Sequence, residues 1–291
     1  MRVRVHASIA NFGPGFDVFG VGVGAPYDEL TFRESNEWEV RVNGFSVPSD
    51  GRNVAVVSAK ALASLVGEEL ALKLELRKGV PPAGGLGSSG ASSLAGALAA
   101  ARTLGVEDER LILRAAMEGE RHAAGSAHAD NVVPAYYGDF TLITSTAPLQ
   151  VMRVPVDFDV VIVLPHLKIP TRKAREVLPG SVPLDTAVRA ISLASSLVLA
   201  LREGDLPAVG RLLDDPVALP YRKRLMPWYD RVREAALEAG AYGLSVSGSG
   251  PAVFALGEDP EDIGEAVAGA FAEMGVASDV YVTRAGVGAV W

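Results

Sequence analysis

The part of the chain best suited to chemistry is a glycine-rich segment, PPAGGLGSSG, at residues 81–90. It lies between residues 70–76, where leucines alternate with other residues as in a strand, and residues 88–104, an alanine-rich stretch that predicts a helix. The first turn of a helix has unpaired N–H groups, and glycines let such groups approach a phosphate closely. Ser88 and Ser89 are also able to cap the helix and to bind Mg²⁺. The segment predicts a phosphate site, with a capped helix and flexible lead-in as the ordinary alternative.

Two other phosphate motifs do not fit this segment. The chain has no Gly-Lys-Ser/Thr sequence, so the loop is not a Walker A motif. No lysine occurs between Lys78 and Lys168, so a triphosphate would be held by backbone dipoles and a metal ion. The acidic residues 107–109 open a predicted helix instead of ending a second strand, which disfavours a dinucleotide-binding fingerprint.

The composition limits the class of protein. The chain has 291 residues, which predicts one large domain or two ordinary ones. Its net charge of −8 gives no basic surface, so binding to nucleic acid or to a membrane surface is not expected. It has no cysteine, which excludes disulfides and thiolate zinc sites. Residues 1–13 contain no long apolar run, so we expect no signal peptide and a cytoplasmic location.

Strand and helix patterns alternate along the chain and predict an α+β protein with domains at residues 1–157 and 158–291. The order in the second domain, strand, helix, strand, strand, helix, strand with one extra helix, indicates a ferredoxin-like split βαβ unit. The predicted strands are residues 2–6, 30–33, 38–42, 70–76, 139–143, 150–154, 160–164, 244–247, 252–256 and 280–283. The predicted helices are residues 53–66, 88–104, 107–118, 185–202, 228–239 and 261–274.

Three motifs in order along the chain point to a family. Residues 8–17 read SIANFGPGFD, residues 81–89 match Pro-x-x-x-Gly-Leu-Gly-Ser-Ser, and residues 243–251 read GLSVSGSGP. In these motifs the sequence resembles the GHMP kinases. The resemblance implies an N-terminal domain of the ribosomal-protein-S5-domain-2-like fold, a C-terminal ferredoxin-like domain, and ATP with Mg²⁺ in the cleft. The residues that it assigns to ATP are Pro81, Pro82, Ala83, Gly84, Gly85, Leu86, Gly87, Ser88, Ser89, Gly90 and Ala91.

Within this family the chain resembles the homoserine kinases at residues 11–20, 127–132, 171–179 and 220–227. Mevalonate and galactose kinases are similar to it at the glycine loop but much less at these segments. The resemblance implies transfer of the γ-phosphate of ATP to the hydroxyl of L-homoserine. This substrate is a zwitterion, whose carboxylate suits guanidinium groups and whose ammonium suits carboxylates. The residues expected around it are Asn11, Asp17 and His128, with Arg175 and Arg222 toward its carboxylate.

The resemblance also assigns residues at the reacting end of the substrate. Asp130 and Asn131 are expected beside the hydroxyl, and Glu120 is expected to bind Mg²⁺ with Ser88 or Ser89. No general base is assigned, because in a loose transition state the alcohol can lose its proton late, to the phosphate itself. Each residue also has an ordinary interpretation, such as a helix cap for Asp130 and Asn131 or a helix-face salt bridge for Glu120.

Several alternatives stay open at this point. Arg172 and Arg224 lie so close in sequence to Arg175 and Arg222 that either neighbour is able to take the assigned role. A GHMP kinase acting on shikimate or mevalonate is a second interpretation, and a ligand sensor of the same fold without turnover is a third. The sensor is disfavoured because the loop serines and the acidic site residues are all present. A homodimer is expected from the resemblance alone.

Overall fold

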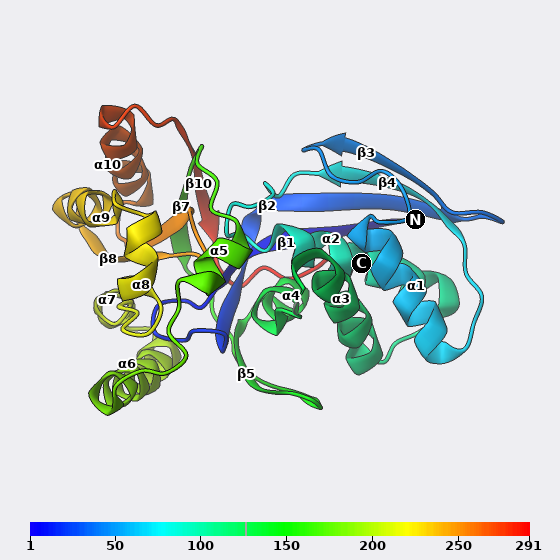
Figure 1. The fold of residues 1–291 in the computed structure, drawn as a ribbon, viewed down its shortest axis with the longest axis horizontal. Coiled ribbons are helices and arrows are strands. Elements are labelled where there is room, and N and C mark those ends of the chain that lie inside the picture. The colour runs from blue at the N-terminus through cyan, green and yellow to red at the C-terminus, as the bar shows by residue number, and fades with distance from the viewer. Residues whose placement is uncertain (126) are drawn as a thin grey trace.

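The structure is a computed structural model that describes residues 1–125 and 127–291, apart from the side chain of Ala124. Its strands form two sheets, a 6-stranded sheet from the first half of the chain and a 4-stranded sheet from the second half. Figure 1 shows the two sheets side by side, each with helices packed against it. The predicted α+β class is confirmed.

The first sheet is built around β2, a strand of 16 residues that pairs with β1, β4 and β5. Its order is β3-β4-β2-β5-β6, and β1 lies alongside β2. The β3–β4 pair is parallel, and the other pairs in this sheet are antiparallel. The strands are β1 Arg2–Ala10, β2 Phe19–Glu34, β3 Glu39–Gly44, β4 Leu72–Lys78, β5 Phe140–Thr146 and β6 Leu149–Val154.

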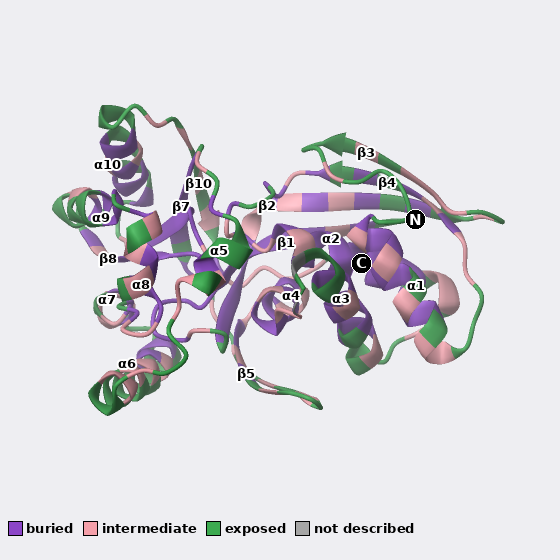
Figure 2. Ribbon diagram, in the orientation of Figure 1, coloured by how far each residue is buried: buried purple, intermediate pink, exposed green. Residues whose placement is uncertain are grey.

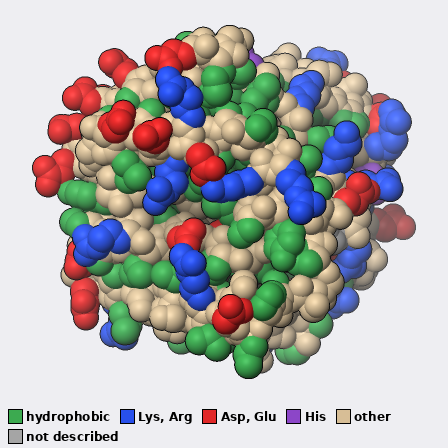
Figure 3. Space-filling view, turned by 60° about the vertical axis from the view of Figure 1, so that its left-hand side comes forward, with side chains coloured by type: hydrophobic (Ala, Val, Ile, Leu, Met, Phe, Trp, Pro, Cys, Tyr) green, Lys and Arg blue, Asp and Glu red, His purple; other side chains and the backbone are tan. Residues whose placement is uncertain are grey.

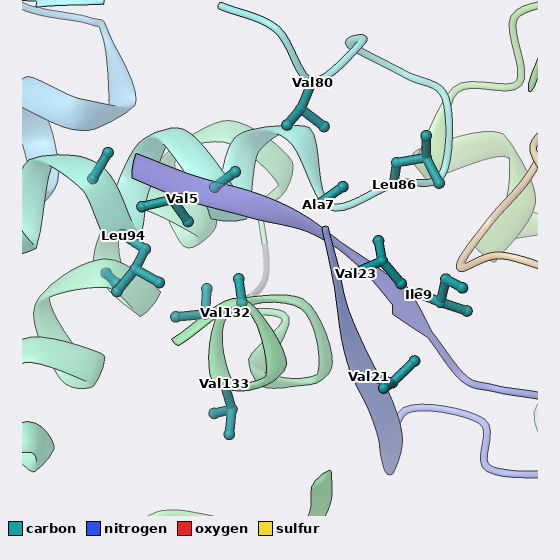
Figure 4. Packing of buried hydrophobic residues seen from close by; sticks show 14 of the residues in the cluster. Val5, Ala7, Ile9, Val21, Val23, Val80, Leu86, Leu94, Val132 and Val133 are labelled. Carbon is teal, nitrogen blue, oxygen red and sulfur yellow. The ribbon is translucent and has the colours of Figure 1, made fainter. Parts of the chain in front are cut away.

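One face of this sheet is covered by helices α1 to α4 (Figure 1). Helix α2 is buried along most of its length, which explains its alanine-rich sequence, because only short side chains fit between helices that pack closely on several sides. Figure 4 shows Val5 of β1, Leu94 of α2 and Val132 of α4 in the resulting core. The helices are α1 Val54–Val66, α2 Ser88–Leu104, α3 Glu109–Ala124 and α4 Ala129–Tyr137.

The second sheet has the order β10-β7-β9-β8, with each neighbouring pair antiparallel. This is the predicted ferredoxin-like arrangement, in which β9 lies between the strands that begin the unit. Helices α9 and α10 pack against the sheet around a second apolar cluster that includes Trp228 and Phe271. The elements are β7 Asp159–Pro165, β8 Ala241–Val246, β9 Val253–Gly257, β10 Ser278–Arg284, α9 Tyr229–Glu238 and α10 Pro260–Glu273.

The two halves of the chain share one apolar core. Phe12 stacks on Phe254 at 4.9 Å between ring centroids and meets Phe140 edge-on at 5.5 Å. The end of the chain also returns to the first sheet, where Val290 bridges Arg4. A site between the halves is therefore held by contacts from both sides.

Four short helices were not predicted: α4, α5 Thr171–Glu176, α7 Leu206–Arg211 and α8 Leu219–Arg222. They are too short to show a helical period, and α4 also contains Pro134. The predicted serine cap of α2 is wrong, because the cap is Gly87 in a left-handed conformation without a side-chain hydrogen bond. The ordinary alternative for Asp130 and Asn131, a helix cap, does not hold either, because both lie inside the first turn of α4, where His128 is the cap. The remaining helix, α6 Leu184–Glu203, follows the predicted range closely.

Candidate active site

A cavity of about 450 Å³ lies between the start of α2 and segments from both halves of the chain. Its volume is typical of sites for small molecules, which span about 300–1,000 Å³. The three motifs, residues 8–17, 81–89 and 243–251, all contribute to its wall, although they are far apart in the sequence. The predicted residues that line it are Asn11, Asp17, Pro82, Ala83, Gly84, Gly85, Gly87, Ser88, Ser89, Glu120, His128, Asp130, Asn131, Arg175 and Arg222.

The glycine loop is held from behind by the third motif. Ser247 donates its hydroxyl to the carbonyl oxygen of Gly85 at 2.7 Å, and the Ala252 N–H donates to the Gly84 carbonyl at 3.1 Å. Gly87 has φ of 66°, and a Cβ at that position would lie 2.4 Å from Ser8 Oγ. The loop therefore needs glycine at Gly87 for its conformation and for space. The N-terminal end of α2 is left facing the cavity, where its N–H groups favour an anion.

A buried ion pair supports the same loop from the sheet side. Lys78 Nζ lies 2.6 Å from Asp28 Oδ2 and donates to the Ser88 carbonyl at 3.1 Å. Asp28 also accepts from Ser92 Oγ at 2.6 Å and from the N–H groups of residues 79 and 80 at 3.0 and 2.9 Å. Burial lowers the pKa of Lys78, and the attraction of Asp28 opposes this shift. The pair joins β2, β4 and the first two turns of α2.

Acidic and imidazole side chains meet on one wall of the cavity. His128 Nδ1 lies 3.3 Å from Glu120 Oε2, and this contact raises the pKa of His128 against the opposing effect of burial. The other carboxylate oxygen of Glu120, Oε1, is buried and has no hydrogen-bond partner among the described residues. Burial, reinforced by the nearby carboxylate of Asp17, raises the pKa of Asp130 to about 7. Such a wall provides both an unshared anionic oxygen and a carboxyl group that titrates near neutral pH.

Two arginines also line the cavity. Arg175 binds Asp17 with two hydrogen bonds of 2.6 and 2.7 Å, which joins α5 to the loop after β1. Arg222 is buried and donates to the Gly248 carbonyl at 2.8 Å. Both guanidinium groups lie over the ring of Phe16, at 5.4 and 5.3 Å from its centroid. Their positive charges therefore point at the same region of the cavity.

The loop that carries Asp17 is fixed by an asparagine. Asn11 has φ of 68° and Asp17 has φ of 58°, both in the left-handed region that these residue types tolerate. The side chain of Asn11 accepts from the Asp17 N–H at 3.0 Å and donates to the Gly248 carbonyl at 2.9 Å. Asn11 thus holds Asp17 in place and joins the motif at residues 8–17 to the motif at residues 243–251.

Some predicted residues lie outside the cavity. Leu86 points away from it and is fully buried in the core, and Pro81, Gly90 and Ala91 are not part of its wall. The structure also separates the neighbouring arginines. Arg172 is exposed and pairs with Glu176 at 2.8 Å, and Arg224 is exposed beyond α8, so neither lines the cavity.

Sequence reasoning missed several residues of the site. Lys78, Ser92, Arg52, Asn53 and Thr171 also line the cavity. The position of Lys78 at the end of a strand directly before the glycine loop was an available signal. The other missed residues line the cavity because their segments fold against the loop. Such contacts between distant segments leave no local pattern in the sequence.

The comparisons with known proteins fit this geometry. The family model described as the GHMP kinases N terminal domain matches residues 53–139, and the model described as GHMP kinases C terminal matches residues 197–276. The first match contains the glycine loop and the acidic wall, and the second contains Arg222 and the motif that supports the loop. The class of protein that the fold and the cavity define is therefore a GHMP-type kinase.

Individual relatives narrow the class. A homoserine kinase from Thermococcus gammatolerans is 73% identical, with both chains covered to 100%, and one from Pyrococcus abyssi is 57% identical, covering 100% of this chain and 99% of the relative. A crystal structure of homoserine kinase from Cytophaga hutchinsonii superposes with a TM-score of 0.92 at 38% identity, covering 100% of this chain and 96% of that one. The chain belongs to the homoserine kinases of the GHMP kinase family.

Proposed function

We propose that this protein transfers the γ-phosphate of ATP to the hydroxyl of L-homoserine, giving O-phospho-L-homoserine and ADP, a step of threonine biosynthesis. The observation that carries the proposal is the cavity in which the open end of α2 meets Asp17, Arg175 and Arg222. A helix N-terminus suits a polyphosphate, and paired carboxylate and guanidinium groups suit a zwitterion. The full-length relatives named homoserine kinase agree with this pairing of substrates.

For the phosphates we propose backbone N–H groups at residues 85–89 as the ligands. Magnesium would be held by Glu120 together with Ser88 or Ser89, and it would neutralise charge on the phosphates. The residues fit such an ion because Glu120 Oε1 is buried without a partner in the described chain. The Ser88 hydroxyl donates its proton to the Val80 carbonyl at 2.8 Å, which leaves lone pairs on its oxygen for a cation.

The described residues contain no group of three or more His, Asp or Glu side chains arranged to hold a metal ion by themselves. A site made of Glu120 and a serine hydroxyl therefore needs phosphate oxygens and water to complete an octahedron. This coupling makes the cation and the nucleotide bind together.

For the amino acid we propose that Arg175 and Arg222 bind the carboxylate and that Asp17 binds the ammonium group, with Asn11 and His128 beside them. Bidentate contacts from guanidinium to carboxylate are favourable, and Phe16 keeps both guanidinium planes in position. In the structure Arg175 and Asp17 bind each other. The carboxylate of the zwitterion would replace Asp17 as the partner of Arg175, and its ammonium group would replace Arg175 as the partner of Asp17. A neutral alcohol has no means to replace that ion pair.

In the proposed reaction the substrate oxygen attacks the γ-phosphorus while the bond to the β,γ-bridging oxygen breaks, and ADP leaves. Asp130 and Asn131 would orient the alcohol, and the Ser8 hydroxyl, 3.5 Å from Asn131 Oδ1, helps to fix that amide. The proton of the alcohol would pass to the transferred phosphate late in the step, which a loose transition state permits. Alignment and charge neutralisation, not a dedicated base, would supply most of the acceleration.

The proposal is tested by coupled detection of ADP with MgATP and a panel of alcohols that includes L-homoserine, shikimate and mevalonate. We expect turnover with L-homoserine and a loss of at least about a hundredfold in kcat for Glu120→Ala, because a metal ligand is removed. Glu118→Ala on the same helix is the control, since that carboxylate is exposed and pairs with Arg121 at 2.8 Å.

Three results would overturn parts of the proposal. Turnover of another alcohol with L-homoserine untouched would make the protein a different GHMP kinase. Ligand-induced thermal stabilisation without any release of ADP would make it a sensor. Activity of Glu120→Ala equal to that of Glu118→Ala would remove Glu120 from the metal site.

We further propose that the enzyme acts in the cytoplasm as a homodimer, without binding nucleic acid or a membrane. The net charge of −8 supports the absence of a surface for polyanions. We also propose residues 1–157 and 158–291 as the domains, in support of which the strands of the first sheet end at Val154 and those of the second begin at Asp159.

A further inference from the structure

Arg222 depends for its position on a very short helix. Helix α8 has only four residues, Leu219–Arg222, and a helix of that length has too few internal hydrogen bonds to be stable by itself. Its last residue, Arg222, is only 5% exposed and carries the guanidinium group that the proposed function assigns to the substrate carboxylate. Figure 2 shows α8 close to α5, which carries the second of these arginines. Contacts from outside α8 must therefore hold it in place.

A buried carboxylate holds the start of this helix. The Asp215 side chain is buried, and its Oδ1 accepts from the N–H groups of Val217 and Ala218 at 2.9 Å each. Its Oδ2 accepts from the Leu219 N–H at 3.1 Å. The first turn of a helix leaves such N–H groups without partners, and a carboxylate suits them well. Asp215 therefore does for α8 what the side chain of Ala218, at the cap position itself, is unable to do.

The peptide groups that Asp215 fixes lead directly to Arg222. The Ala218 N–H donates to Asp215, and the carbonyl oxygen of Ala218 accepts from the Arg222 N–H at 3.0 Å. Beyond the backbone, Arg222 Nε and Nη1 donate to the carbonyl oxygens of Ala174 and Gly248 at 3.3 and 2.8 Å. A guanidinium group has five N–H donors, so donors remain for the carboxylate of a substrate.

Asp215 also places a negative charge near the guanidinium group. Burial raises the pKa of Asp215, and the hydrogen bonds from the backbone and the charge of Arg222 oppose this shift. Burial lowers the pKa of Arg222, and Asp215 is the largest of the charges that oppose that shift. A buried charge without an opposite charge nearby is costly, so each of the two groups stabilises the other.

We infer that Asp215 is a positioning residue for the proposed reaction, because it holds Arg222 at the place where the substrate carboxylate binds. The inference rests on the proposed function, since it gives Asp215 a part in the binding of L-homoserine. Asp215 does not line the cavity, so it acts only through α8. The ordinary alternative is a helix cap that contributes to stability alone.

The preceding residue shows why the position of this carboxylate matters. Asp214 is also an aspartate, but its side chain is 44% exposed and pairs with Arg189 at 2.5 Å. Figure 3, which brings this side of the molecule forward, shows acidic side chains beside basic ones over much of the surface. Water screens such exposed pairs, so the loss of one has little effect. Asp214→Ala therefore serves as a control for the loss of a charge next to Asp215.

Steady-state kinetics of Asp215→Ala, compared with Asp205→Ala, test the inference. Asp205 is the matched control, because it caps α7 by accepting from the Ala208 N–H at 2.9 Å, and no residue of α7 lines the cavity. We expect Asp215→Ala to raise the KM for L-homoserine about tenfold, because its arginine is displaced. The KM for MgATP should stay within about twofold of wild type, and so should both constants in Asp205→Ala and Asp214→Ala.

Asp215→Asn is the conservative variant. Asparagine caps helices about as well as aspartate, and its carbonyl oxygen is able to replace Oδ1 but not Oδ2, so the KM for L-homoserine should rise only about threefold. Circular dichroism and urea unfolding show whether each variant is folded. If Asp215→Ala does not fold, Asp215→Asn decides, and a KM equal to that of wild type would contradict the inference.

A double-mutant cycle tests whether the effect passes through Arg222. In an Arg222→Ala background, Asp215→Ala should lower kcat/KM for L-homoserine by no more than about twofold, because the residue that it positions is already absent. Losses that multiply would show a general structural effect and overturn the inference. A KM in folded Asp215→Ala equal to that of Asp205→Ala would also overturn it, but would leave the proposed function standing. Wild-type protein without turnover of L-homoserine would overturn both.

Discussion

Replacing Lys78 by methionine tests the claim that a buried ion pair holds the phosphate loop. Lys78 and Asp28 are both buried, at 2% and 0% side-chain exposure, and their charged atoms lie 2.6 Å apart. The variant keeps the length and much of the volume of the side chain but removes its charge. Asp28 then keeps its three other hydrogen-bond donors but has no counter-charge.

The size of the effect follows from the burial of the pair. Removing one partner of a buried ion pair costs about 3–5 kcal/mol, because the remaining charge stays in a region of low dielectric. The stability of a typical domain is about 5–15 kcal/mol, so the loss is a large share of the total. Lys78 also donates to the Ser88 carbonyl, so the first turn of α2 loses an anchor and nucleotide affinity should fall as well.

Urea unfolding measures this loss, with Lys73→Met as the matched control. Lys73 lies on the same strand and pairs with Glu39 at 2.8 Å, but both side chains are about one-third exposed, so its loss should cost less than about 1 kcal/mol. Adding Asp28→Asn to Lys78→Met removes the stranded charge and should recover part of the loss. The reasoning is refuted if Lys78→Met is as stable as Lys73→Met.

Three further predictions concern the cavity. The Asp130 carboxyl has a pKa of about 7, above its unfolded value of 3.8, so the stability that it contributes is present below pH 3.8 and is lost as the pH rises through about 7. Asp130→Asn should therefore gain stability relative to wild type over this pH range, by at most about 4 kcal/mol. Urea unfolding at several pH values measures this gain, and a stability difference that does not vary with pH would contradict the prediction. Arg222→Ala should lower kcat/KM for L-homoserine by about a hundredfold or more, as expected for a lost charged contact, and steady-state assays should find Arg224→Ala within about twofold of wild type. Gly87→Ala should weaken nucleotide binding, measured by calorimetry, about tenfold. Gly105→Ala is the control, because Gly105 has nearly the same φ of 67° but no described atom within 4 Å of a Cβ, and it should only cost about 1 kcal/mol of stability. Equal nucleotide binding by both variants would remove the steric argument.

The fold was largely predictable because its main elements carry local patterns. The helix predicted at residues 88–104 is α2 as observed, and the ferredoxin-like order of the second sheet followed from the sequence of strands and helices. Elements shorter than a few turns, such as α5 and α8, escaped because they contain too few residues to show a period. The cap of α2 was mispredicted because Gly87 in the left-handed region took the position expected for a serine.

The sequence alone determined that a helix begins at the glycine loop and that its first turn is free of lysine, since both depend on neighbouring residues. It favoured Arg175 and Arg222 by resemblance but left their neighbours Arg172 and Arg224 open as alternatives. Tertiary structure chose between them, because the choice depends on which face of α5 and α8 packs toward the loop after β1. The same holds for Asp28, 50 residues from Lys78, which acquired its partner only when β2 and β4 came together in one sheet. Contacts between distant segments have no period in the sequence, and they decide where the charges in this cavity lie.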